Sequence, residues 1–296
     1  MRIAVTGKSG QVVTSLLERG KAAGHEVIAL GRPELDLADP NTIDLAIAAA
    51  NPDVIISAAA YTAVDKAESE EDLAYAINAR GAGAVAAAAA RLNVPLIHLS
   101  TDYVFDGALD RPWTETDPTR PIGVYGLSKL AGEDAVLAAS GADCAILRTS
   151  WVYSPFGANF VKTMLRVAHD RDEVSVVADQ IGNPTSALDI ADGVLKVAEN
   201  LAANANPALR GVFHMTAQSE ASWADFARRI FALSAELGGP SASVRSITTA
   251  EYPTPAARPA NSRLDCTKLA AAHGVTLPDW QTGLPPVIAR LLVSAA

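Results

Sequence analysis

The chain is poor in cysteine, and its two cysteines cannot build a disulfide framework for 296 residues. Cys144 lies in an apolar run and Cys266 follows a late loop. Neither stands in a CxxC or His/Cys spacing, so we expect no metal site. Basic residues are also in deficit. The formal net charge of -9 argues against nucleic acid or an anionic membrane surface as the partner.

Long apolar runs are missing as well. Even the alanine-rich stretch 84–93 is too short and too weakly apolar to cross a bilayer. The chain opens with MRIAVTG, without the basic region and apolar core of a signal peptide. We therefore expect a cytoplasmic protein with no membrane partner. Its 49% hydrophobic content indicates a globular fold, and its length allows a large core with two lobes.

In the first half of the chain, short β-rich apolar runs alternate with longer alanine- and leucine-rich segments. Continuous apolar strands separated by helices indicate a parallel sheet that is covered on both faces. The pattern therefore predicts an α/β fold with a Rossmann-type doubly wound parallel sheet. The predicted strands are 2–7, 26–30, 53–60, 95–101 and 144–150, and the predicted helices are 10–22, 40–50, 71–92 and 124–140.

After Trp151 the alternation becomes less regular. The sequence predicts helices at 156–170 and 186–203, a strand with a loop at 174–185, a strand at 211–217 and a Pro-rich loop at 252–265. We interpret this as a smaller α+β substrate-binding lobe. The expected division is a dinucleotide-binding domain of 1–151 plus about 187–216, and a lobe of about 152–186 plus 217–296.

A glycine turn follows the first predicted strand, in TGKSGQVV (6–13). Gly7 allows a sharp turn, and Gly10 lets the backbone approach a diphosphate at the N-terminus of the next helix. Val13 stands where a third glycine often appears. As a lone motif this is weak, and a plain tight turn is the alternative. Its place as the first strand–turn–helix of a parallel sheet favours dinucleotide binding.

The end of the second strand bears on the choice of cofactor. An acidic residue there usually binds the ribose hydroxyl of NAD, whereas an arginine receives the 2′-phosphate of NADP. This chain has Gly31 and Arg32, so we favour NADPH, with NADH as the second choice. The alternatives are that Arg32 is a solvated surface residue and that Asp36 binds a ribose or the adenine.

Two further strand ends carry small or hydroxyl side chains. Ala58 to Ala60 follow the third strand, where small residues would let a cofactor pass, although packing explains them equally well. Thr101 ends the fourth strand, and ligands of open α/β sheets bind outside the carboxyl ends of the strands. Its hydroxyl would bond a substrate carbonyl. A simple Thr-Asp turn is the alternative.

Tyr125 and Lys129 stand four residues apart at the start of a predicted helix, and therefore on one face of it. Hydride transfer to a ketone creates an alkoxide that needs a proton. A phenol is a poor acid at neutral pH, but a nearby ammonium favours the phenolate and lowers the phenol pKa. The pair is reactive if a nicotinamide lies beside it, and ordinary helix decoration otherwise.

Taken together, these motifs resemble the extended short-chain dehydrogenase/reductases and, more closely, the dTDP-4-dehydrorhamnose reductase family. The resemblance covers nearly the full length, and the combination is far more specific than any single motif. The matching pieces are AAAYTAVDKAE (58–68), STDYVFDG (100–107), VYGLSKLAGE (124–133), LRTSWVY (147–153), DQIGNPT (179–185) and YPTPAARPANSRLD (252–265).

The resemblance implies an oxidoreductase that acts on a nucleotide sugar. Hydride from NADPH or NADH would reduce the 4-keto group of dTDP-4-dehydro-6-deoxy-L-mannose to give dTDP-L-rhamnose. Tyr125 would donate the proton, and Lys129 would bind the nicotinamide ribose hydroxyls and lower the pKa of Tyr125. Thr101 would lie beside the keto oxygen, where many relatives have serine.

Further positions match the family by alignment of these motifs. Asp102 and Trp151 match substrate positions. Arg258 is predicted from its residue type to meet a diphosphate oxygen, with a surface arginine as the equal alternative. The positions that match cofactor contacts are Gly7, Gly10, Gln11, Val12, Arg32, Asp36, Leu37, Ala60, Tyr61 and Thr62.

The chain also departs from the family pattern. Val13 in place of glycine would hold the first helix slightly farther from the strand. Some relatives dimerise through a metal bound by glutamates, and this chain has Ser15 where one of them lies. We therefore expect no bridging metal and leave the choice of monomer or homodimer open. Tyr61 stands where some relatives have histidine.

Two other functions remain as alternatives. A bifunctional epimerase/reductase, as in GDP-fucose synthesis, would need an additional acid–base pair, often Cys and His, and no convincing pair is visible. A non-catalytic regulatory subunit with the same fold, of the kind known for methionine adenosyltransferase, would not need Thr101, Tyr125 and Lys129 together.

Overall fold

The computed structural model describes residues 1–141 and 143–293, and its centre is a six-stranded sheet in which every pairing is parallel. The strand order is β10-β5-β4-β3-β1-β2. The strands are β1 (Arg2–Thr6), β2 (Glu26–Leu30), β3 (Val54–Ser57), β4 (Leu96–Thr101), β5 (Cys144–Thr149) and β10 (Gly211–His214). The predicted α/β doubly wound fold class is confirmed.

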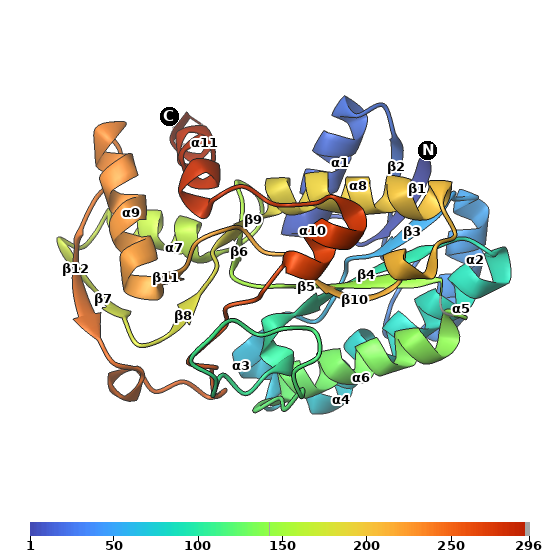
Figure 1. The fold of residues 1–296 in the computed structure, drawn as a ribbon. Helices are drawn as coiled ribbons and strands as arrows, with labels where there is room; N and C mark the ends of the chain where they lie inside the picture. The colour runs from blue at the N-terminus through green and yellow to red at the C-terminus, as the bar shows by residue number, and fades with distance from the viewer. Residues whose placement is uncertain (142, 294–296) are drawn as a thin grey trace.

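Helices cover both faces of this sheet because its strands are apolar on both sides (Figure 1). One face packs on α1 (Gln11–Ala22) and α8 (Ala187–Ala203), with Val5 and Leu16 in a shared core. The other packs on α2 (Pro40–Ala50), α5 (Ala82–Leu92) and α6 (Val124–Ala139), with Ile55 and Val136 in a second core.

The chain reverses its winding direction at β1, whose neighbours in the sheet are β2 and β3. In open α/β sheets a crevice forms at such a switch point, outside the carboxyl ends of the strands. The glycine turn after β1 and the Ala58–Ala60 segment after β3 therefore meet there. An alanine methyl at Gly7 would lie 3.3 Å from Ala59 Cβ.

The predicted helix at 71–92 is not uniform. It consists of α4 (Glu71–Tyr75), a π-helical segment η1 (Ala76–Gly81) and α5, and it follows the short α3 (Val64–Ala67). Side chains and backbone are crowded at this segment. A methyl on Gly81 would lie 2.5 Å from the Leu37 carbonyl, and one on Gly132 of α6 would lie 2.1 Å from the Asn78 carbonyl.

A second group of elements forms its own core beside the sheet (Figure 1). Its helices are α7 (Phe160–Val167), α9 (Trp223–Glu236) and α11 (Trp280–Val293), and its strand pairs are β7 (Glu173–Val177) with β12 (Ser243–Ile247), β8 (Ile181–Gly182) with β11 (Ala221–Ser222), and β6 (Val152–Tyr153) with β9 (Thr185–Ser186). The segment 174–185, predicted as a strand with a loop, thus contributes to three short strands.

The short elements η2 (Asp102–Val104), η3 (Pro207–Leu209), η4 (Thr249–Glu251) and α10 (Thr267–His273) complete the chain. Helix α10 packs near β10 and α8, and Leu269 belongs to the core of the sheet. The assignment of 217–296 as a whole to a separate lobe stays a prediction, since α10 contacts the other part of the molecule.

The close contact between α6 and η1 leads to a prediction about stability. Gly132→Ala should lower the free energy of unfolding by about 1–3 kcal/mol, because the methyl meets backbone that cannot yield. Gly193→Ala in α8 is the matched control, since its methyl would meet the flexible ends of Leu277 and Met215. It should be nearly neutral. Denaturant unfolding measures both, and equal losses would contradict the packing argument.

Candidate active site

The turn between β1 and α1 has the geometry of a diphosphate cradle. Gly7 has φ +103°, and its N–H donates to the Leu30 carbonyl at 2.6 Å. The first turn of α1 consists of Gln11, Val12 and Val13, none of them acidic, so its N–H groups and the positive end of the helix dipole favour an anion. The residues present therefore fit a dinucleotide.

The side chain of Val13 fills space that would be empty if this position were glycine. It is buried, and its Cγ2 would lie 3.1 Å from a methyl on Gly7. Gly7 therefore has to be glycine both for its backbone angle and for the room that Val13 takes. Val12 is half-buried against the core of the sheet, so its backbone rather than its side chain faces the turn.

Gln11 connects the turn to the second group of elements. Its side-chain oxygen accepts hydrogen bonds from Ser154 at 2.8 Å and from Asn159 at 3.0 Å. Its amide nitrogen donates to the Val152 carbonyl at 3.4 Å. Of the predicted cofactor contacts, Gln11 therefore spends its side chain inside the protein and offers its backbone N–H at the helix start.

Two cationic side chains, Arg32 and Lys8, lie at the end of β2. The sequence did not single out Lys8. Arg32 is exposed, as an arginine that receives a phosphate would be. Lys8 donates to the Arg32 carbonyl at 3.1 Å and also pairs with Glu34. The lysine stands between the two glycines of the turn, and this basic position was the signal that could have identified it.

The other predicted positions after β2 serve the local turn. Asp36 accepts from the Ala38 N–H at 2.9 Å, and its own N–H donates to Thr42 at 2.9 Å. Leu37 is buried beneath η1 and contacts Gly81. These contacts hold the loop that follows the β2 strand end.

The segment after β3 is held by Asn78, which the sequence reading also missed. The side chain of Asn78 accepts from the Tyr61 N–H at 2.7 Å and donates to the Tyr61 carbonyl at 3.1 Å. It also donates to Ser128 on α6 at 3.0 Å. The strip Ala60, Tyr61 and Thr62 is therefore fixed relative to α6. An asparagine between the apolar residues Ile77 and Ala79 of a predicted helix was the available signal.

Thr101 and Tyr125 meet at the carboxyl end of β4, as the sequence predicted for a shared crevice. Burial raises the pKa of the Tyr125 phenol to about 12, the Thr101 hydroxyl as a hydrogen-bond partner lowers it, and the Asp102 charge raises it further. The expected lowering of this pKa is therefore wrong for the structure described here. The phenol is held firmly in its protonated form.

The reason lies in where Lys129 points. Its ammonium donates to the Leu99 carbonyl at 2.7 Å and lies 3.3 Å from Nε2 of His98, both on β4. Burial lowers its pKa to about 8, and Glu133 acts in the opposite direction. Tyr125 and Lys129 do share one face of α6, but the lysine charge is directed at the strand rather than at the phenol.

A buried ion pair lies one turn further along α6. Arg148 on β5 donates to both carboxylate oxygens of Glu133, with a shortest distance of 2.6 Å, and Ser100 donates to the same carboxylate at 2.5 Å. The Arg148 guanidinium also lies over the Phe105 ring, 5.1 Å from its centroid. These contacts connect α6 to β4 and β5 directly beneath the site.

The predicted substrate residues contact the Pro-rich loop or the second group of elements. Asp102 is buried, which raises its pKa to about 6, while the hydroxyls of Ser262 and Thr101 oppose the shift. Ser262 belongs to the Pro-rich loop, so that loop reaches the end of β4. Arg258 in the same loop pairs with Asp65 of α3 at 2.9 Å.

Trp151 follows β5 with a positive φ of +46°. Its indole stacks on Trp223 of α9, with centroids 3.6 Å apart and an interplanar angle of 10°. On the same indole packs Gly182, where a methyl would lie 2.6 Å from the ring. Trp223 was not predicted, because only the tertiary fold brings α9 to the end of β5.

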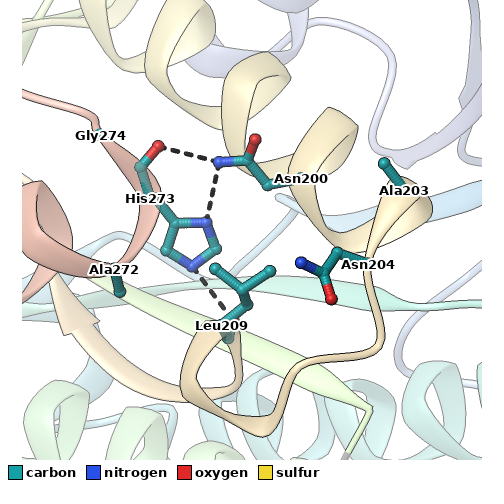
Figure 2. A pocket seen from close by; sticks show the side chains of 7 residues that line it. All are labelled: Asn200, Ala203, Asn204, Leu209, Ala272, His273 and Gly274. Carbon is teal, nitrogen blue, oxygen red and sulfur yellow. Dashed lines mark hydrogen bonds between the residues drawn. The ribbon is translucent and has the colours of Figure 1, made fainter.

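A hollow between α8, η3 and α10 lies at the opposite, amino end of β10 (Figure 2). Its histidine, His273, donates from Nε2 to the Leu209 carbonyl at 3.1 Å and accepts at Nδ1 from Asn200 at 3.4 Å. Asn200 also donates to the His273 carbonyl at 2.9 Å. These hydrogen bonds pair the His273 ring with its neighbours, so we assign this histidine a structural role.

Metal and membrane features can be judged for the described residues 1–141 and 143–293. Within them, no group of three or more His, Cys, Asp or Glu side chains is arranged for a metal ion. No helix in this part of the chain is long and apolar enough to cross a membrane. Ser15 is buried, and its hydroxyl donates back to the Gln11 carbonyl at 2.9 Å.

The ion pair under the site makes the next prediction. Arg148→Met should lower the free energy of unfolding by about 3–5 kcal/mol, because Glu133 is left buried without its partner. Adding Glu133→Gln should recover part of that loss. Arg91→Ala, which breaks an exposed pair with Asp44, is the control and should change stability by less than about 1 kcal/mol. Equal losses in denaturant unfolding would exclude this role.

Comparison with known proteins identifies relatives over nearly the whole chain. A family model described as the RmlD substrate binding domain matches residues 1–293. A dTDP-4-dehydrorhamnose reductase of Sinorhizobium fredii is 52% identical over 293 residues, which cover 99% of this chain and 98% of that protein.

Two solved structures agree in fold. A dTDP-4-dehydrorhamnose reductase of Clostridium acetobutylicum is 39% identical with a TM-score of 0.91, covering 99% of this chain and 100% of that one. One of Bacillus anthracis, in complex with NADP, is 35% identical with a TM-score of 0.89, covering 97% and 98%. The chain belongs to the dTDP-4-dehydrorhamnose reductase family, as the resemblance of its motifs indicated.

Proposed function

We propose that this chain reduces the 4-keto group of dTDP-4-dehydrorhamnose to give dTDP-L-rhamnose, the final step of dTDP-rhamnose synthesis, with NADPH as hydride donor. Family membership supports the substrate. The observation that carries the chemistry is the meeting of Thr101 and Tyr125 at the carboxyl end of β4. This is the edge of the sheet where the glycine turn of β1 also lies.

NADPH supplies the hydride when it is bound. The chain contributes the N–H groups of the first turn of α1 for the diphosphate, and Gly7 keeps the approach open. Arg32, with Lys8 beside it, provides positive charge at the end of β2 for a 2′-phosphate. The complex of the Bacillus anthracis relative with NADP supports this choice of donor.

Tyr125 donates the proton to the oxygen of the reduced carbonyl. A reduction needs the phenol in its protonated form, and a pKa of about 12 keeps it so across the neutral range. Thr101 orients the carbonyl oxygen, because its hydroxyl lies beside the phenol at the strand end. Lys129 contributes a buried ammonium one helical turn away that binds the nicotinamide ribose hydroxyls.

The second lobe and the Pro-rich loop hold the nucleotide sugar. We assign Asp102 and the Trp151 indole, which is fixed by Trp223 and Gly182, to the substrate side. Arg258 would meet a diphosphate oxygen and exchange part of its pairing with Asp65 for that contact. The proposed lobes are 1–151 plus about 187–216, and about 152–186 plus 217–296.

An epimerase/reductase is not favoured by the position of the cysteines. Cys144 begins β5, at the amino end of the sheet, and contacts Ser140 at 3.1 Å. Cys266 contacts Thr216, with its sulfur 3.3 Å from the Thr216 N–H. Neither contact includes a histidine that would complete the second acid–base pair.

Removing the phenol hydroxyl tests the proton donor. Tyr125→Phe should lower kcat by about two to four orders of magnitude, the usual size of an acid–base contribution, and leave NADPH affinity nearly unchanged. The assay follows NADPH oxidation with freshly generated dTDP-4-dehydrorhamnose. Tyr153→Phe is the matched control, because it removes a buried hydroxyl that bonds the Trp280 carbonyl at 3.3 Å. Unchanged turnover in Tyr125→Phe would remove the assignment.

The choice of cofactor is tested at the end of β2. Arg32→Ala should weaken NADPH binding by about tenfold, the loss of one charge-assisted contact, and change NADH binding little. Titration calorimetry with both cofactors measures the difference. Arg91→Ala, another exposed arginine, controls for net charge. Equal weakening of the two cofactors would mean that Arg32 does not bind the 2′-phosphate.

A further inference from the structure

His98 is a buried histidine that the proposed reaction does not use. It lies on β4, and its Nε2 is 3.3 Å from the Lys129 ammonium. An ammonium has only donors, so Nε2 must be the acceptor and the ring proton must lie on Nδ1. Nδ1 lies 3.1 Å from the Ser57 hydroxyl oxygen, and its N–H donates a hydrogen bond to that oxygen. The neighbours of the ring therefore decide its tautomer.

The three residues come from three adjacent elements. Ser57 ends β3 and lies opposite His98 in the sheet register, while Lys129 reaches down from α6. The Leu99 carbonyl, next in the chain after His98, accepts from the same ammonium at 2.7 Å. Two of the three ammonium donors thus point at β4, and one remains for a ligand.

We propose that His98 is a positioning residue of the reduction: with the Leu99 carbonyl it holds the Lys129 ammonium in place, and Ser57 keeps its ring in the accepting tautomer. This inference rests on the proposed function, because it gives Lys129 its role at the nicotinamide ribose. The histidine acts through the lysine and touches neither cofactor nor substrate.

Burial keeps the imidazole ring of His98 uncharged. Burial and the nearby lysine charge hold the pKa of His98 well below its usual range, so the ring stays an acceptor at neutral pH. The titratable groups around Lys129 are Tyr125 and Glu133 on α6, His98 on β4 and, through its pair with Glu133, Arg148 on β5. Among them His98 is the side chain within hydrogen-bond distance of the ammonium.

The sign of the effect follows from the charge. A neutral acceptor favours the charged ammonium, so its removal lowers the pKa of Lys129 below its present value of about 8. Since the reaction uses the charged lysine, activity should fall above this pKa. The alkaline limb of kcat/KM then moves to lower pH when the acceptor is lost.

The experiment compares pH profiles of kcat/KM for the wild type, His98→Leu and His98→Gln with NADPH and dTDP-4-dehydrorhamnose. His98→Leu should shift the alkaline limb down by about one pH unit, the size of one hydrogen bond to a charged group. His98→Gln, which can still present an acceptor, should return the limb to near its wild-type position. Ser57→Ala should shift it in the same direction by less.

A matched control separates positioning from general loss of a buried histidine. His273→Gln changes the histidine of the hollow in Figure 2, which contacts Leu209 and Asn200 far from the site, and should leave the limb in place. A limb in His98→Leu that matches the wild type would overturn the proposal. So would a shift in His273→Gln as large as that in His98→Leu.

A readout without turnover distinguishes this proposal from the proposed function. Titration of 15N-labelled lysine side chains by NMR, with Lys129→Met to assign the signal, reports the Lys129 pKa directly. A value about one unit lower in His98→Leu supports the contact even if the keto sugar is not reduced by the wild type, which would refute the proposed function alone. An unchanged Lys129 pKa overturns the contact.

Discussion

The site depends on how closely α6 approaches the backbone beside it. A methyl at Gly126 would lie 2.2 Å from the Tyr103 carbonyl, and one at Gly132 would lie 2.1 Å from the Asn78 carbonyl. Both glycines therefore let the helix touch backbone on two sides. This contact brings Tyr125 to Thr101, and Lys129 to the middle of β4. A helix one side chain farther out would leave the phenol and the lysine away from the strand ends.

A layer of buried charge lies beneath this contact. Lys129 and Glu133 stand one turn apart on α6. Lys129 contacts His98 on β4, and Glu133 accepts hydrogen bonds from Ser100 on β4 and Arg148 on β5. Ions removed from water are costly unless they are paired and hydrogen-bonded, and here each has a partner within hydrogen-bond distance. The same burial lowers the pKa of Lys129 and raises that of Tyr125. Packing and acid–base chemistry are therefore set by one arrangement.

The two parts of the molecule meet around the same edge of the sheet. Gln11, in the first turn of α1, accepts hydrogen bonds from Ser154 and Asn159, which lie just before α7 in the second group of elements. Trp151 leaves β5 in a left-handed conformation that turns its indole onto Trp223. Ser262 reaches back to Asp102 from the far end of the chain. The glycine turn, the end of β5 and Asp102 are thus joined by direct contacts to the second group of elements and to the Pro-rich loop, so a displacement of either would move the strand ends.

The sequence by itself determined the parallel sheet and which residues lie at the carboxyl edge of that sheet. Apolar runs of strand length, separated by helical segments, lead to a parallel α/β sheet, because continuous strands must be covered on both faces. Parallel strands end at one edge, so the sequence pattern alone brings Gly7, Thr101 and the helix of Tyr125 together. Local spacing was enough for these features.

Only the tertiary structure decided where the charges point. Periodicity put Lys129 on the face of Tyr125, but the Leu99 carbonyl and His98 turn its ammonium toward β4, and burial raises the phenol pKa instead of lowering it. Asn78, Trp223 and Ser262 reached the site from segments far away in the chain. Residue types and short spacings carry no information on such long-range contacts or on the burial that shifts a pKa, because both arise when the separate elements pack.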